Sequence, residues 1–114
     1  MTAASFRKTA LAHPETAESS HMGHPDFRVC GKIFATLGHP GPGWGMVKLT
    51  PAQQDEFVGS DPDAFVPVNG AWGRRGATNV HLRSVSARSL RMALDAAWSN
   101  TAPPQLTGLR RSRP

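Results

Sequence analysis

The sequence predicts an α+β domain of two layers, with an antiparallel sheet covered by helices on one face. Three observations lead to this prediction: helical apolar spacing near both ends of the chain, alternating apolar and polar residues between them, and turn residues at the boundaries. Gly and Pro supply the turns, with 11 and 10 of the 114 residues. Alternating strands are typical of antiparallel sheets with one face open to solvent. The expected order of elements is α-β-β-β-α-β-β-α.

The first helix is expected over residues 3–13. Phe6 and Ala10 stand at helical spacing within it. Pro14 ends the helix because proline donates no backbone hydrogen bond and restricts the residue before it. The polar stretch at 18–24 is compatible with either a loop or an edge strand.

A β-hairpin is expected next, over residues 27–37. Gly31-Lys32 suits a type II′ turn, in which glycine takes the positive φ of the first central position. In this register Val29 lies opposite Phe34, and Cys30 lies opposite Ile33. The alternative is one long strand with a bulge at Gly31.

The second helix has the clearest start signal in the chain. Thr50-Pro51-Ala52-Gln53 combines a Thr N-cap, Pro at the first helical position and Gln at N3, which is a capping box. This helix is expected to end at Gly59. The segments around it are a Gly/Pro loop at 38–43, a strand at 44–49, an extended piece at 65–68, a Gly-rich segment at 69–76 and a strand at 78–82.

The last helix is expected from about residue 87 to 99, with Ser84 or Ser86 as its N-cap. It carries one apolar stripe, made of Ala87, Leu90, Leu94, Ala97 and Trp98. Pro103 and Pro104 end the ordered part. Residues 1–102 are therefore predicted to form a single domain, followed by a flexible basic tail at 103–114.

Charge and cysteine content narrow the class of protein. Thirteen Lys and Arg against eight Asp and Glu give a net charge of +5, but three of the arginines lie in the last five residues. A single cysteine excludes an intrachain disulfide, and no apolar run approaches the roughly 18 residues of a membrane span. No apolar segment follows Arg7 and Lys8, so we expect no signal peptide and a cytoplasmic location.

No motif predicts an enzyme, a metal site or a cofactor. His21 and His24, with Cys30 and His39 downstream, lack the paired spacing of zinc ligands. The chain has no Gly-x-Ser-x-Gly elbow and no Walker loop. The loop at 38–45 contains two prolines, which remove amides that a phosphate-binding loop needs.

The most suggestive segment for binding is Ala71-Trp72-Gly73-Arg74-Arg75-Gly76. Tryptophan offers a stacking surface, the arginines offer bidentate phosphate donors, and the glycines allow a ligand to approach the backbone. The alternative is that Trp72 packs at the edge of the core while the arginines bind carboxylates such as Asp61 and Asp63.

A series of short motifs runs in one order through residues 5–100. They are His21-Met22-Gly23, Phe27-Arg28-Val29, residues 31–37, Lys48-Leu49-Thr50-Pro51, residues 65–68, Gly70-Ala71-Trp72-Gly73, Ala77-Thr78, Ala93-Leu94 and Ala97-Trp98. In this order and spacing they resemble the MmcQ/YjbR family of small bacterial proteins. The resemblance implies a double-wing fold, similar to CyaY-like and secretion-chaperone-like folds. It also implies DNA binding, because family members are commonly described so from the likeness of that fold to a DNA-binding wing.

The matched positions divide between core and surface. The expected core residues are Phe27, Val29, Ile33, Phe34, Leu49 and Trp98. The candidate residues for binding nucleic acid or an anion are Trp72, Arg74, Arg75, Arg28, Lys32 and Lys48.

The sequence therefore predicts a non-enzymatic DNA-binding module that uses the open sheet face and residues 72–76. Non-specific phosphate contacts would be salt-dependent, with a Kd on the order of 10⁻⁴ to 10⁻⁶ M. The alternative is a protein-interaction or chaperone-like domain that binds an extended peptide or a second copy on its sheet. A third interpretation, binding of a small anion or metabolite at Trp72, Arg74 and Arg75, requires a concave pocket.

Overall fold

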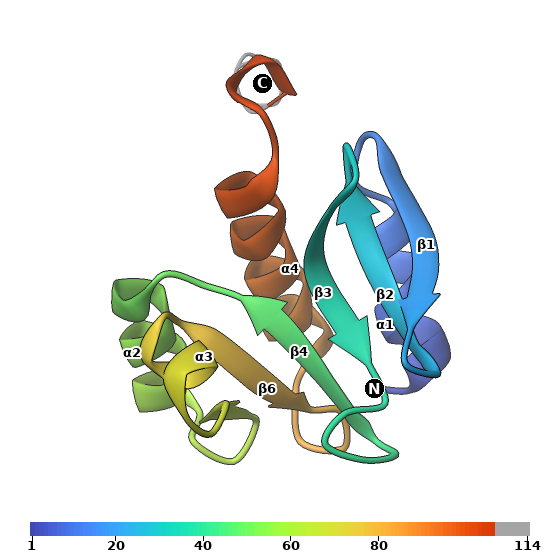
Figure 1. Cartoon of the computed structure of the whole chain (residues 1–114). Helices are drawn as coiled ribbons and strands as arrows, with labels where there is room; N and C mark the ends of the chain where they lie inside the picture. The colour runs from blue at the N-terminus through green and yellow to red at the C-terminus, as the bar shows by residue number, and fades with distance from the viewer. Residues whose placement is uncertain (107–114) are drawn as a thin grey trace.

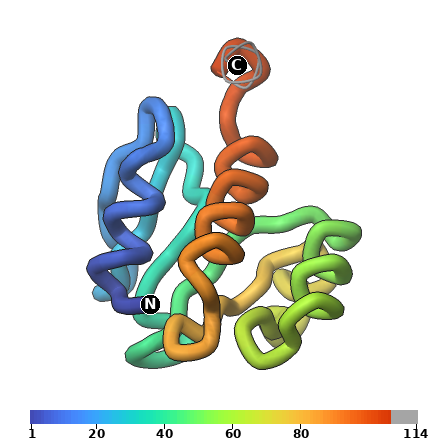
Figure 2. The backbone as a smooth tube through the Cα atoms, turned by 180° about the vertical axis from the view of Figure 1, so that it is seen from behind, coloured from blue at the N-terminus to red at the C-terminus, as the bar shows by residue number. Residues whose placement is uncertain are grey.

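The computed structural model describes residues 1–106 and consists of a six-stranded sheet with helices packed behind it (Figure 1). In chain order the elements are α1 (Ala3–Leu11), β1 (Thr16–His21), β2 (His24–Val29), β3 (Lys32–Leu37), β4 (Trp44–Lys48), α2 (Pro51–Ser60), β5 (Phe65–Pro67), α3 (Ala71–Arg74), β6 (Ala77–His81) and α4 (Ala87–Thr101). The strands lie in the order β1-β2-β3-β4-β6-β5, and all neighbours are antiparallel. Figure 2 shows α1, α4 and α2 on one side of the sheet. The expected α+β class is confirmed.

The order of elements differs from the expected one at two points. Most of the polar stretch at 18–24, for which the sequence allows either a loop or an edge strand, belongs to the edge strand β1. This strand pairs along its whole length with β2. The Gly-rich segment at 69–76 contains the single helical turn α3. Helix propensity does not predict this turn, because the segment is rich in glycine. Gly73 nevertheless allows the turn to pack, since a Cβ at this position would collide with the Val68 carbonyl.

The β2–β3 hairpin turns one residue earlier than expected. Val29 lies opposite Lys32 rather than opposite Phe34. The two central residues are Cys30 and Gly31, with φ of 50° and 83°. Positive φ at both central positions defines a type I′ turn, whose twist matches that of the flanking strands. The predicted type II′ turn at Gly31-Lys32 is therefore wrong.

A bulge does occur in this hairpin, but inside the strands rather than at the turn. Arg28 pairs with Ile33 and Phe27 pairs with Ala35, so Phe34 is an extra residue on β3. The bulge lets Phe34 and Ala35 both point into the core, where each is fully buried. Ile33 consequently lies on the opposite face of the sheet.

The core fills the space between the sheet and helices α1 and α4. Phe6 of α1 is fully buried, and so are Leu90, Leu94, Ala97 and Trp98 of the predicted stripe of α4, whereas Ala87 at its start is exposed. The core residues expected from the sequence are confirmed as buried for Phe27, Val29, Phe34, Leu49 and Trp98. The expectation for Ile33 is wrong, because of the bulge.

The starts of α2 and α4 follow the predicted capping signals, whereas α1 ends at Leu11 rather than at residue 13 and α2 ends at Ser60 rather than at Gly59. Thr50 Oγ1 accepts a hydrogen bond from the Gln53 amide at 3.2 Å, and Gln53 Oε1 accepts one from the Thr50 amide at 2.9 Å, which completes the capping box. Ser86 caps α4 by accepting from the amide of Ser89.

The boundary of the predicted domain at residue 102 stays a prediction. Leu106 packs partly buried against the core, and residues 107–114, which contain the tail arginines, lie outside the described residues. Between Met1 and Leu106, no helix has the length and apolar character needed to cross a membrane. The cytoplasmic location also stays a prediction.

Candidate functional site

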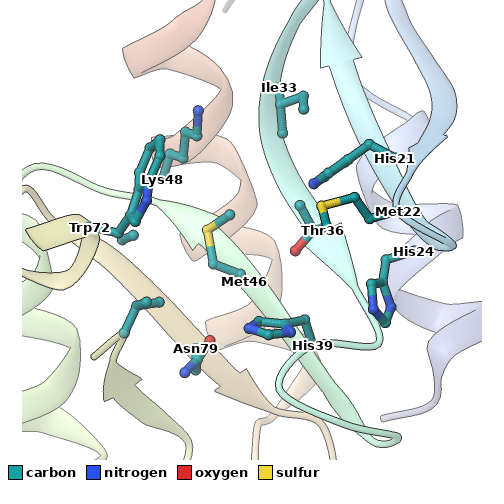
Figure 3. Close-up of a pocket in the computed structure, with 12 residues that line it drawn as sticks. His21, Met22, His24, Ile33, Thr36, His39, Met46, Lys48, Trp72 and Asn79 are labelled. Atoms are coloured by element: carbon teal, nitrogen blue, oxygen red, sulfur yellow. The ribbon is translucent and has the colours of Figure 1, made fainter. Parts of the chain in front are cut away.

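A concave cavity of about 430 Å³ lies on the face of the sheet that α1 and α4 leave open (Figure 3). Strand alternation places its residues: Met46 and Lys48 of β4 lie opposite Asn79 and Ala77 of β6, and all four point away from the core. The full lining is His21, Met22, His24, Ile33, Thr36, His39, Met46, Lys48, Val68, Trp72, Ala77 and Asn79. The cavity thus draws on both halves of the sheet.

Trp72 forms one wall of this cavity. Its side chain is 60% exposed, so it does not pack at the edge of the core as the alternative interpretation held. Lys48 Nζ lies over the indole, 5.6 Å from the ring centroid, in a cation–π contact. Two candidate residues from distant parts of the chain are therefore side by side.

The position of Trp72 depends on Gln54, which sequence reasoning did not identify. Gln54 of α2 is buried, and its Nε2 donates to the carbonyls of Gly73 at 2.9 Å and Ala77 at 3.0 Å. These hydrogen bonds attach the short helix α3 to α2 and β6. Because α3 is a single turn, it depends on such tertiary contacts for its stability.

Asn79 places a polar group in the apolar part of the cavity. Its Oδ1 is buried and has no hydrogen-bond partner among residues 1–106. A buried acceptor without a partner costs about 1–3 kcal/mol, so such an atom requires an explanation. Alternation along β6 predicts that Asn79 faces away from the core, but no sequence signal predicts a missing partner.

A second, shallower hollow of about 520 Å³ borders the cavity near the C-terminal end of α4. Arg28, Lys32 and Lys48 line it, together with Asn100 and Thr101 of α4. We call it the basic hollow. Lys48 belongs to both the cavity and the basic hollow, and no Asp or Glu of the described chain lines either one.

A carboxylate on the same sheet face, Asp26, is fully buried and neutralised by its neighbours. Its oxygens accept hydrogen bonds from Arg28 Nε at 2.8 Å and Nη2 at 3.0 Å, and they lie 2.8 Å from His21 Nδ1. The hydrogen bonds from Arg28 hold the pKa of Asp26 below its usual range, although burial opposes this shift. The same pairing raises the pKa of Arg28.

Arg74 and Arg75 line neither the cavity nor the basic hollow. Both are exposed near the end of α3. Within the described residues neither forms an ion pair, with Asp61 and Asp63 or with any other carboxylate. The structure thus brings together four of the six candidates and leaves these two apart.

The histidines around the cavity do not converge on a common point. The rings of His24 and His39 meet edge to face at 5.9 Å, whereas His21 contacts Asp26. In the part of the chain that the structure describes, no three His, Cys, Asp or Glu side chains are grouped so as to hold a metal ion. Cys30 is exposed at the tip of the hairpin.

Two comparisons with known proteins, one by sequence family and one by structure, find similar proteins. The YjbR family model matches residues 11–100. The crystal structure of protein DR2400 from Deinococcus radiodurans, with the family-model domain DUF419, has a TM-score of 0.76 to this structure. The match covers 96% of this chain and 85% of that chain at 18% sequence identity, so it shows a shared fold. A comparison with curated proteins finds no match.

Proposed function

The chain belongs to the YjbR family, and from the charges on its open sheet face we propose that it is a non-enzymatic DNA-binding protein. The observation that carries this proposal is the basic hollow, where Arg28, Lys32 and Lys48 converge from three strands or their ends. Of these three, only Arg28 has a carboxylate partner among the described residues, the buried Asp26, which does not line the hollow. Cations gathered on a concave surface attract phosphates. Asp26 balances the charge of Arg28, so Lys32 and Lys48 supply the positive charge of the hollow that has no carboxylate partner among the described residues.

The proposed contacts are to the phosphate backbone. Arg28 uses Nε and Nη2 for Asp26, which leaves Nη1 for a phosphate oxygen. Asp26 also fixes the direction of this guanidinium, so less conformational freedom is lost on binding. The apolar stripe of α4 is buried in the core, so we expect no recognition helix and little sequence preference.

Fluorescence anisotropy with a labelled duplex tests the proposal at about 50 and 200 mM salt. The full chain is compared with a Lys32→Ala, Lys48→Ala double variant. The matched control is an Arg74→Ala, Arg75→Ala double variant, which removes the same charge outside both hollows. We expect the lysine variant alone to lose most of the affinity, and its salt slope to fall by about 1 for each lysine that contacts a phosphate.

A chain that ends at Leu106 separates the domain from the tail arginines. Binding that survives this truncation belongs to the basic hollow or its surroundings. If only the full-length chain binds, or if the two double variants lose affinity equally, the proposed role of the basic hollow is wrong.

The edge strand β1 favours a second candidate function, the binding of an extended peptide or a second copy of the chain. β1 is exposed, and its outer edge pairs with no strand of the described chain. Such an edge can accept a further strand through backbone hydrogen bonds. Those bonds are insensitive to salt, so a dimer that persists at high salt in analytical ultracentrifugation would favour this function over phosphate binding.

A further inference from the structure

Phosphate contacts at the basic hollow do not require the apolar cavity beside it. We propose that this cavity binds a nucleobase that is not stacked on its neighbours, either in a single strand or in a free nucleotide. The inference rests on the proposed DNA-binding function and makes it more specific, because a base inside a duplex cannot enter a cavity.

The cavity has the size and lining that such a ligand needs. Its volume of about 430 Å³ lies within the roughly 300–1,000 Å³ of small-molecule sites. Ile33, Met46 and Ala77 provide an apolar floor. The exposed indole of Trp72 provides a flat wall of the kind on which bases stack in single-strand-binding proteins.

The position of Lys48 selects a nucleotide over other ligands. Its ammonium group lies over Trp72, and it also lines the basic hollow with Arg28 and Lys32. A base stacked on the part of the indole that Lys48 leaves free would therefore have cations beside it for its phosphate. A purely apolar ligand would leave these cations unused, and a simple anion would leave the cavity unfilled.

Asn79 supplies a polar group for the edge of the base. Its amide lies beside Met46 in the cavity (Figure 3), and Oδ1 lacks a partner among the described residues. Rotation about the Cβ–Cγ bond exchanges the amide oxygen and nitrogen, so the side chain can present an acceptor or a donor. Asparagine pairs with bases through both groups, adenine being the best-known case. Because Oδ1 is buried in this conformation, a base in the cavity would bond to whichever end of the amide faces the cavity.

The test compares two strands that differ only in their bases. One is a labelled oligo(dA) strand, and the other has the same length and the same phosphates but abasic sugars throughout. Fluorescence anisotropy with the full chain should show tighter binding of oligo(dA), on the order of tenfold to a hundredfold for one stacked base. The bases of a duplex are stacked and cannot enter the cavity. The affinity of a duplex of equal length, per phosphate contacted, should therefore be no higher than that of the abasic strand.

Two variants locate the base. Trp72→Ala should lower the affinity for oligo(dA) to that for the abasic strand and leave the latter unchanged. The matched control is Trp44→Ala, which removes a tryptophan that stacks on His81 outside the cavity. Asn79→Leu should also weaken binding of oligo(dA) alone, and it removes the unpaired amide, so its fold should be at least as stable as that of the wild type.

The outcomes separate this inference from the proposed function. If both strands bind equally and Trp72→Ala changes neither, the nucleobase site is overturned while DNA binding stands. If no strand or duplex binds but adenosine monophosphate does, with dependence on Trp72, the site stands and the DNA-binding function is overturned. If nothing binds at low salt, both are overturned.

Discussion

His13 Nε2 lies 2.6 Å from Asp95 Oδ1, which joins the end of α1 to the middle of α4 across 82 positions of the chain. The other ring nitrogen, Nδ1, lies 3.0 Å from the Thr9 carbonyl and 3.2 Å from the Ala10 carbonyl. These carbonyls belong to the last turn of α1, and that of Ala10 also accepts from the backbone amide of His13 at 3.2 Å. One buried side chain therefore caps a helix and attaches it to its neighbour.

Substitution of this histidine should destabilise the protein without affecting the open face. We expect His13→Ala to lower the free energy of unfolding by about 1–3 kcal/mol, because it removes a buried imidazole that packs against Phe34 and Trp98 and contacts Asp95. Urea denaturation measures the change, with His39→Ala at an exposed position as control. A His13→Ala change no larger than that of the control would contradict this role.

The packing of α3 should be sensitive to the addition of a single methyl group. A Cβ at Gly73 would collide with the Val68 carbonyl, whereas one at Gly59 meets nothing within 4 Å. Gly73→Ala should therefore cost about 1–3 kcal/mol or more, and Gly59→Ala should be neutral or stabilising by up to about 1 kcal/mol. Thermal unfolding of both variants checks this, and equal melting temperatures would refute the close approach.

The Asp26–Arg28 pair predicts how stability depends on pH. Because the pKa of Asp26 is lower in the folded than in the unfolded state, the pair stabilises the fold fully above about pH 4. This contribution is lost as the pH falls through the folded-state pKa. Asn resembles a protonated Asp in shape and charge, so Asp26→Asn should be less stable than the wild type at pH 7, and the difference should shrink in acid. Urea denaturation at a series of pH values measures it; a difference independent of pH would exclude the charge as its cause.

The sequence predicts those parts of the fold that depend on local chemistry. The capping box at Thr50, the apolar stripe of α4 and the fold class all follow from residue type and spacing. The single-turn helix α3 does not, because its stability comes from Gln54 and from the close packing of Gly73, which are tertiary contacts. Local propensity contains no information about either.

The residues of the candidate site are likewise predicted only in part from the sequence. Arg28, Lys32, Lys48 and Trp72 are identified from the sequence as polar or aromatic residues with little reason to be buried, and the sheet brings them together. Ile33 is missed as a cavity residue because a bulge decides which residues of β3 face outward, and Asn79 is missed because no sequence signal predicts a buried oxygen without a partner. Ile33 reaches the open face only because Phe34 is inserted in that strand.

Cys30 is the first central residue of the β2–β3 turn, where the register differs from the expected one. This residue has φ of 50°, a left-handed conformation that costs a cysteine more than it costs asparagine or glycine. Cys30→Asn creates Asn-Gly, the preferred pair for a type I′ turn, and should raise the free energy of unfolding by about 0.5–1 kcal/mol. Gly31→Ala places a Cβ at φ of 83° in the same turn and should have the opposite sign. Denaturation of both variants under reducing conditions provides the measurement. A loss of stability in Cys30→Asn would contradict the type I′ turn and would favour the turn at Gly31-Lys32 that the sequence predicts.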